Sequence, residues 1–253
     1  MRKIFVTTFN MSLYKKYAER LIDSYINTSQ EIDLYCYVED DVSLYPKYKN
    51  IFYFNLFNEQ PECLKFIERN KKKSHKESEI SYLLDAVRFS YKVFAQSDAR
   101  KYADQIFFID ADTEFLNKIP QSWFIECLPE DTVISVYDRL GYYTEAGFVG
   151  FNTLPLNKKN QKLLDVFFHQ YTGYYVYDLI YGLPAFTDCH ALDATRFRFM
   201  LLKHYTDNHA NYEEKILGNW LDNHELDVMS HDKFINKIIS SVNLFIRLFL
   251  ISV

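Results

Sequence analysis

Two aspartates, separated by one residue, follow a short apolar run. Residues 106–109 read Ile-Phe-Phe-Ile, and Asp110, Ala111 and Asp112 come directly after them. The run predicts a buried strand, and where the chain leaves a sheet it can turn so that both carboxylates reach one point. Carboxylate oxygens are preferred ligands of Mg²⁺ and Mn²⁺, and a cation bound in this way keeps positions open for phosphate oxygens. The alternative is a solvated acidic turn, because Asp-x-Asp alone is common.

Three charged residues share one face of a predicted helix. Asp85, Arg88 and Lys92 are spaced i, i+3 and i+7 along the chain. The two cations repel each other unless an anion lies between them, and a diphosphate would be such an anion. The alternative is that Asp85 pairs with Arg88 and that Lys92 is solvated.

The hydrophobic spacing predicts the elements that must position these residues. We expect strands over residues 3–9, 32–38, 51–56, 105–109, 132–137 and 148–151, and helices over 13–26, 80–95 and 156–171. Strands alternating with crossover helices predict an α/β fold with an open, mostly parallel sheet flanked by helices. Ligands of such sheets bind beyond the carboxyl ends of the strands, which is where Asp110 and Asp112 would lie.

The composition favours one well-packed domain. Of the 253 residues 48% are hydrophobic, and only 6 Gly and 6 Pro are present, with no linker-like stretch. We expect a single domain over residues 1–234. The net charge of −5 disfavours a nucleic-acid partner, since proteins that bind phosphate backbones usually carry a basic face.

The cysteines and the C-terminal tail indicate where in the cell the protein is expected. The four cysteines include no Cys-x-x-Cys pair, which predicts buried free thiols and a cytoplasmic, reducing environment. Residues 235–253 form a mostly apolar tail that is too short and too charged for a transmembrane helix. The tail either packs on the domain or makes peripheral contact with the inner face of the membrane.

The segment from Phe108 to Thr113, Phe-Ile-Asp-Ala-Asp-Thr, resembles the DxD motif of GT-A glycosyltransferases. Three further segments fit the same family in the same order, namely residues 4–10, 85–92 and 145–152. The resemblance covers about residues 1–230. It implies a Rossmann-like GT-A domain that transfers a sugar from a nucleoside-diphosphate sugar, with UDP-sugars as the most frequent donors of the family.

The resemblance also implies roles for individual residues. Asp112 would ligate Mn²⁺ or Mg²⁺, and Asp110 would serve the metal or the donor ribose. Many members take a third ligand from the C-terminal region, for which His231 and His224 are the candidates. The other expected donor-binding residues lie on the first strand and on the helix before the motif: Thr7, Thr8, Phe9, Arg88 and Lys92.

Two later segments are expected to bind the acceptor and to activate its hydroxyl. Glu145 precedes Gly147, and a glycine in a strand permits close approach of a ligand, although a bulge is the alternative. An inverting transferase needs a general base, for which Asp188 is the first candidate, with Asp193 and Glu145 as the others. Asp193 would otherwise cap a helix, and His190 would orient a carboxylate or bind the acceptor. The sequence does not choose between inversion and retention.

The combined prediction is a metal-dependent glycosyltransferase acting on a glycan or another hydroxyl acceptor. A nucleic-acid acceptor stays open but is not favoured. Two alternatives use the same scaffold: a nucleotidyltransferase, and an inactive module that binds sugar nucleotides. The first is disfavoured because no Gly-rich basic loop follows Phe9.

Overall fold

The chain was studied as a computed structural model, which describes residues 1–74, 81–139, 143–153, 158–206, 209, 211–219 and 229–231. Its strands are β1 (Lys3–Phe9), β2 (Asp33–Val38), β3 (Ile51–Asn55), β4 (Gln105–Ile109), β5 (Thr113–Phe115), β6 (Ile134–Asp138), β7 (Glu145–Asn152), β8 (Glu214–Asn219) and β9 (Met229–His231). Its helices are α1 (Met11–Leu13), α2 (Glu19–Asn27), α3 (Leu56–Glu59), α4 (Pro61–Asn70), α5 (Ala86–Ala99), α6 (Gln121–Cys127), α7 (Lys158–Val176) and α8 (Asp188–Tyr205). The His224 candidate and the tail over 235–253 lie outside the described residues.

Seven strands form one mostly parallel sheet in the order β3-β2-β1-β4-β7-β6-β8. β1, β2, β3 and β4 run parallel, and so do β6 and β8, whereas β7 is antiparallel to both of its neighbours. A small second sheet pairs β5 with β9. The predicted fold class, an open and mostly parallel α/β sheet, is therefore confirmed.

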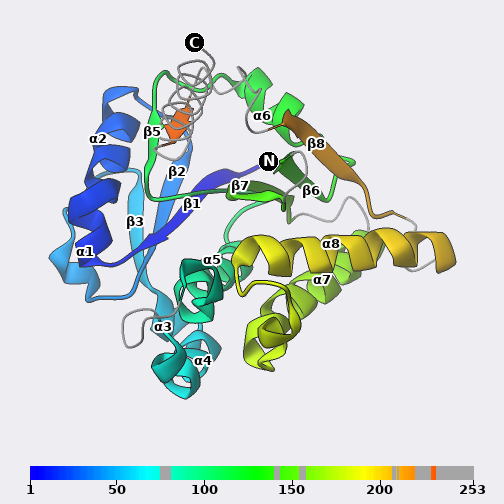
Figure 1. Ribbon diagram of the computed structural model, residues 1–253. Coiled ribbons are helices and arrows are strands. Elements are labelled where there is room, and N and C mark those ends of the chain that lie inside the picture. The colour runs from blue at the N-terminus through cyan, green and yellow to red at the C-terminus, as the bar shows by residue number, and fades with distance from the viewer. Residues whose placement is uncertain are drawn as a thin grey trace, which may run out of the picture.

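Helices cover both faces of the large sheet, as Figure 1 shows. Side chains of β4 alternate between the two sides: Ile106 and Phe108 pack in the core under α4, α5, α7 and α8. Phe107 and Ile109 pack in the core under α2 and α6. Every residue of β4 is buried, so the apolar run before Asp110 forms the centre of the molecule.

The predicted strands agree with the observed ones to within a few residues, but the helix expected over 80–95 starts and ends later. α5 begins at Ala86 because the Asp85 carboxylate caps it, accepting a hydrogen bond from the backbone N–H of Arg88 at 3.2 Å. A 3₁₀ turn at Tyr82–Leu84 precedes this cap. The cap fixes where each later residue of α5 points.

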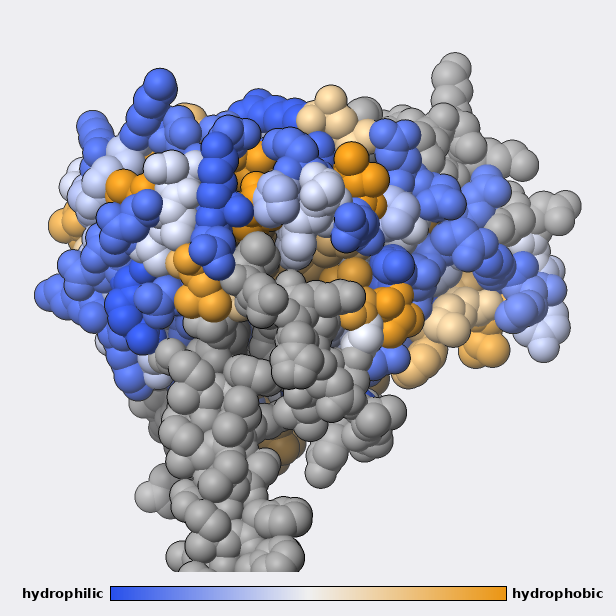
Figure 2. All heavy atoms as spheres, turned by 90° about the horizontal axis from the view of Figure 1, so that it is seen from above, coloured by the Kyte–Doolittle hydropathy of each residue, from blue (hydrophilic) through white to orange (hydrophobic). Residues whose placement is uncertain are grey.

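The surface seen in Figure 2 is mainly hydrophilic over the described residues, with apolar side chains in separate small groups. Within the described part of the chain, no helix combines the length and apolarity needed to span a bilayer. The predicted thiols are confirmed as free: Cys36, Cys63 and Cys127 are buried and Cys189 is half-buried. The aromatic residues mostly pack with one another in the two cores.

Candidate active site

Asp110 lies at the carboxyl end of the central strand β4. Its backbone N–H donates to the carbonyl of Gly147 at 2.9 Å, and its side chain is only 6% exposed. The chain then turns, with the N–H of Thr113 bonded to the Asp110 carbonyl at 3.0 Å. Asp112 lies in this turn and is half-buried. Asp110 and Asp112 therefore lie at the carboxyl end of a sheet strand, as predicted.

Lys92 joins Asp110 to a second carboxylate. Its ammonium forms an ion pair with Asp110 Oδ1 and lies 3.5 Å from Asp188 Oδ2. Burial opposes the charge of Lys92, but the two carboxylates outweigh this effect and raise the pKa of its ammonium above the usual value. The alternative of a solvated Lys92 is therefore wrong, because its side chain is 19% exposed.

Asp188 is the first residue of α8 and is almost fully buried. Thr187 caps this helix and bonds the ring Nδ1 of His190 at 2.7 Å. Burial lowers the pKa of the His190 imidazole, against the opposing charges of Asp193 and Asp188. The ring of Tyr143 packs on His190, so the chain before β7 meets the first turn of α8.

Glu145 and Gly147 begin β7 beside the end of β4. The Glu145 carboxylate accepts from the N–H of Gly147 at 2.8 Å and forms an ion pair with Arg139. Because Phe148 pairs with Ile109, Gly147 lies next to Asp110 on the neighbouring strand, and Glu145 is two residues further along β7. The Glu145 side chain is 2% exposed, so its carboxylate is enclosed by the protein.

Asp193 belongs to a separate buried network. Its carboxylate accepts from the backbone N–H of Thr144 and from Arg196 Nη1, both at 3.1 Å. Arg196 also donates to Glu214 on β8 at 2.7 and 2.9 Å. Asp193 lies inside α8, and Thr187 supplies the cap of that helix. The alternative role of Asp193 as a helix cap is therefore wrong. The network connects α8, β8 and the segment before β7.

The expected donor-binding residues of β1 fall into two groups. The hydroxyls of Thr7 and Thr8 are buried and have no hydrogen-bond partner among the described residues. Both lie beyond Val6, whose partner on β4 is Phe108, two residues before Asp110. The Phe9 ring is 1% exposed and packs against Tyr14 and Tyr45, so it fills the core under α2.

Arg88 and Lys92 pair with different carboxylates of the chain. Its guanidinium lies 3.7 Å from the Asp85 carboxylate and over the ring of Tyr82, 4.8 Å from the ring centre. Its side chain is 39% exposed, whereas Lys92 points inward. The alternative pairing of Asp85 with Arg88 is therefore confirmed, and the two cations lie in different surroundings.

His231 lies on β9 and pairs through its backbone with Thr113, directly after Asp112. The pairing brings this part of the C-terminal region to the motif, and the structure describes no more of His231 than its backbone. Among the described residues, no group of three or more His, Cys, Asp or Glu side chains is arranged to hold a metal ion. Carboxylate oxygens, such as those of Asp110 and Asp112, are nevertheless the donor type that suits Mn²⁺ or Mg²⁺.

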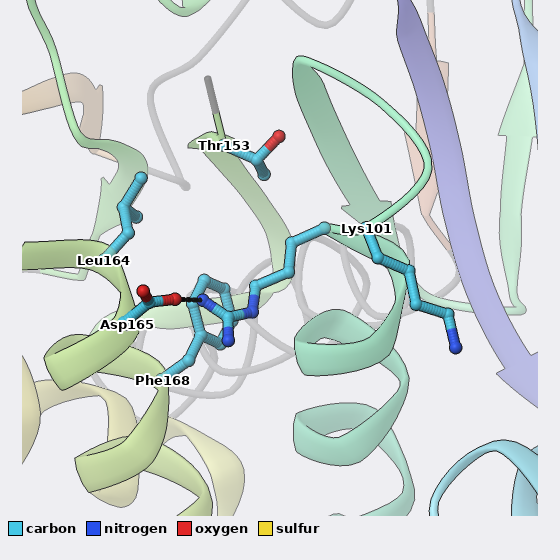
Figure 3. Close-up of a pocket in the computed structure, with 6 residues that line it drawn as sticks. Lys101, Thr153, Leu164, Asp165 and Phe168 are labelled. Carbon is cyan, nitrogen blue, oxygen red and sulfur yellow. Dashed lines mark hydrogen bonds and ion pairs between the residues drawn. The ribbon is translucent and has the colours of Figure 1, made fainter. Parts of the chain in front are cut away.

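A pocket of about 240 Å³ lies elsewhere, between the end of α5 and α7 (Figure 3). In it Arg100 forms an ion pair with Asp165 at 2.7 Å, and Lys101 points away from Asp165 and Phe168. Thr153 bonds to the carbonyl of Asp104, just before β4 begins, at 2.8 Å. The pocket is therefore at the opposite end of β4 from Asp110, and none of the predicted site residues lines it.

Two arginines of the site region were not anticipated. Arg139 follows β6 directly and neutralises Glu145, and Arg196 holds Asp193. A cation two residues after the predicted strand over 132–137, at the end of the sheet where Asp110 and Asp112 are expected, is a signal that would have indicated Arg139. Arg196 gave no such signal, because its partner Glu214 is on a distant strand.

Comparisons with known proteins give only distant similarity. No protein-family model matches the sequence, and no curated protein matches it. The apo crystal structure of mouse xyloside xylosyltransferase 1 is similar over 86% of this chain and 85% of that chain, with 10% identity and a TM-score of 0.49. The apo structure of the bifunctional glycosyltransferase WbbM is similar over 85% of this chain but 38% of that chain, with 13% identity and a TM-score of 0.46. Both TM-scores are below 0.5, so neither similarity assigns a function to this chain.

Proposed function

We propose that this chain is a glycosyltransferase that moves a sugar from a nucleoside-diphosphate sugar to an acceptor hydroxyl. The observation that carries the proposal is the Lys92 ion pair, which joins Asp110 at the end of β4 to Asp188 at the start of α8. Parallel α/β sheets bind their ligands at this edge. The DxD resemblance of residues 108–113 supports a sugar nucleotide, with UDP as its nucleoside diphosphate, as the ligand.

We assign the metal site to Asp112 and His231, with Asp110 beside them. Lys92 already neutralises part of the Asp110 charge, which favours a ribose or water-mediated role for this carboxylate. Mn²⁺ or Mg²⁺, when bound, neutralises the negative charge that develops on the departing diphosphate. Thr7 and Thr8 offer buried hydroxyls to the donor, and Arg88 offers an exposed cation.

We assign the general base to Asp188. In an inverting reaction its carboxylate takes the proton of the acceptor hydroxyl. The acceptor oxygen then forms a bond to the sugar carbon as the bond from that carbon to the diphosphate breaks, and the electron pair leaves with the diphosphate. Asp193 is engaged by Thr144 and Arg196, so we favour a role for it in holding the segment before β7. Glu145, Gly147 and His190 would face the acceptor.

The reaction products distinguish this proposal from its alternatives. The purified chain is incubated with Mn²⁺ and a panel of nucleotide sugars, with and without simple sugar acceptors. Release of nucleoside diphosphate supports transfer, whereas release of pyrophosphate would instead indicate a nucleotidyltransferase. Binding without turnover, detected as a thermal shift, would indicate a sugar-nucleotide-binding module.

The first prediction concerns Asp112→Asn, which keeps the size of the side chain and removes its charge. We expect turnover to fall by about 100-fold or more, because a carboxylate ligand of the cation is lost. The Mn²⁺-dependent thermal shift should disappear as well. Asp23→Asn, an exposed substitution on α2, is the matched control and should leave both unchanged. Full activity of Asp112→Asn would rule out the metal assignment.

A further inference from the structure

Two tyrosine hydroxyls are enclosed in the helical layer behind Asp188. Tyr171 and Tyr175 are both 0% exposed, and neither hydroxyl has a hydrogen-bond partner among the described residues. They are four residues apart on α7, so they lie on one face of the helix. Because a buried hydroxyl without a partner is costly, and phenylalanine would fill the same space, these oxygens need an explanation.

Asp188 presents a third such oxygen to the same region. Its Oδ2 accepts no hydrogen bond among the described residues and has only the 3.5 Å ion pair with Lys92. Burial and then the charge of Asp188 raise the pKa of the Tyr171 and Tyr175 phenols, so this carboxylate lies within electrostatic reach of both. α7 packs against α5 and α8, which brings the three oxygens to one interior.

The other groups that face Asp188 come from its neighbouring elements. α5 contributes Lys92, and α8 contributes Cys189 and His190, with Asp193 one turn further. Lys92 is the only cation for which the described residues show an ion pair with Asp188. It contacts one oxygen and does not by itself fix the rotation of the carboxylate.

We propose that Tyr171 and Tyr175 are positioning residues that hold the Asp188 carboxylate through an ordered water. Neither hydroxyl forms a direct hydrogen bond with the carboxylate, and a buried water commonly joins such polar groups. Held in this way, one oxygen of Asp188 faces Lys92 and the tyrosines, and the other is directed to the acceptor hydroxyl. This inference rests on the proposed function, with Asp188 as general base.

The test uses Tyr171→Phe, Tyr175→Phe and the double variant in the full chain. Each substitution removes one oxygen and keeps the ring, so the fold should be retained, as checked by circular dichroism. We expect the kcat of the double variant to fall about tenfold, since hydrogen bonds to a charged group are lost, while KM for the donor stays unchanged. The acid limb of the kcat–pH profile should move to higher pH, because a carboxylate with fewer donors binds a proton more readily.

Tyr177→Phe is the matched control, since Tyr177 directly follows α7 and is 60% exposed. It should leave kcat and the pH profile unchanged. Wild-type kcat and an unshifted acid limb in the double variant would overturn the positioning role and leave the proposed function standing. A wild-type chain that turns over no nucleotide sugar would overturn both, so the two failures are distinguishable.

Discussion

At the scale of single residues, the candidate site is built around one ammonium group between two carboxylates. Lys92 reaches Asp110 and Asp188, which are 78 positions apart in the numbering and lie on different elements. Both carboxylates are at most 6% exposed, so the cation compensates charges that are largely shielded from solvent. Stability and site geometry therefore depend on the same side chain.

The residue-scale prediction is that Lys92→Met destabilises the protein by about 3–5 kcal/mol, because it removes the cation from two buried carboxylates. The free energy of unfolding is measured by urea denaturation. Adding Asp188→Asn to Lys92→Met should restore part of the loss, since one buried charge is then removed.

Lys65→Met is the matched control. Lys65 also pairs with an acidic residue, Glu62, but the two side chains are 61% and 47% exposed. Exposed pairs contribute little, so a change of at most about 1 kcal/mol is expected. Equal losses in the two variants would contradict a special contribution of the buried pair.

At the scale of elements, the site forms where a strand end, a helix face and a helix start meet. β4 delivers Asp110, α5 delivers Lys92, and α8 delivers Asp188. The cap at Asp85 sets the first turn of α5 and hence the direction in which Lys92 points, two turns later. The Asp85 side chain is 1% exposed and also pairs with Arg88, so it is well fixed.

The element-scale prediction concerns this cap. Asp85→Ala should lower the free energy of unfolding by about 0.5–2 kcal/mol, because the N–H of Arg88 loses its acceptor. Asp85→Asn keeps a side-chain oxygen that can accept the bond and should cost less. Urea denaturation of the three proteins measures the difference. Equal losses for alanine and asparagine would show that the charge pairing with Arg88, and not the cap, matters.

At the scale of the whole molecule, one sheet separates two apolar cores, and its central strands are covered on both faces. β1, β4 and β7 lie inside the sheet, whereas β3 and β8 form its edges. β8 is fastened to α8 by the Arg196–Glu214 ion pair, whose two side chains are 5% and 9% exposed. Local unfolding should therefore be easiest at the edge strands β3 and β8, and the loss of a contact should increase it most in these strands.

The whole-molecule prediction uses amide hydrogen exchange. β1 and β4 should exchange most slowly, and β3 and β8 faster, because edge strands open without disrupting the cores. Arg196→Met should accelerate exchange in β8 by about tenfold or more and leave β1 unchanged. Arg198→Met, an exposed substitution on the same helix, is the control. Unchanged exchange of β8 in Arg196→Met would mean that the ion pair does not hold this edge.

Most of the fold could be predicted because it depends on local patterns. The apolar runs in the sequence predict β1 and β4 with the bounds that the structure shows. The position of Asp110 directly after β4 follows from the same runs. The start of α5 differs from the prediction because Asp85 caps the helix and does not belong to one of its faces. The roles assigned to single site residues, including the metal ligands, remain predictions, since only their positions are described.

The sequence by itself determined the α/β class and the presence of two carboxylates at the end of a buried strand. Both features depend on residues that are close in the chain, because the spacing of apolar residues decides which segments become buried strands and helices. Only the tertiary structure decided that Lys92 turns inward to Asp110 and Asp188 while Arg88 stays at the surface, and that Asp193 belongs to Arg196. The partner of a buried charge is chosen by the packing of distant elements, because burial makes an unpaired charge too costly to keep.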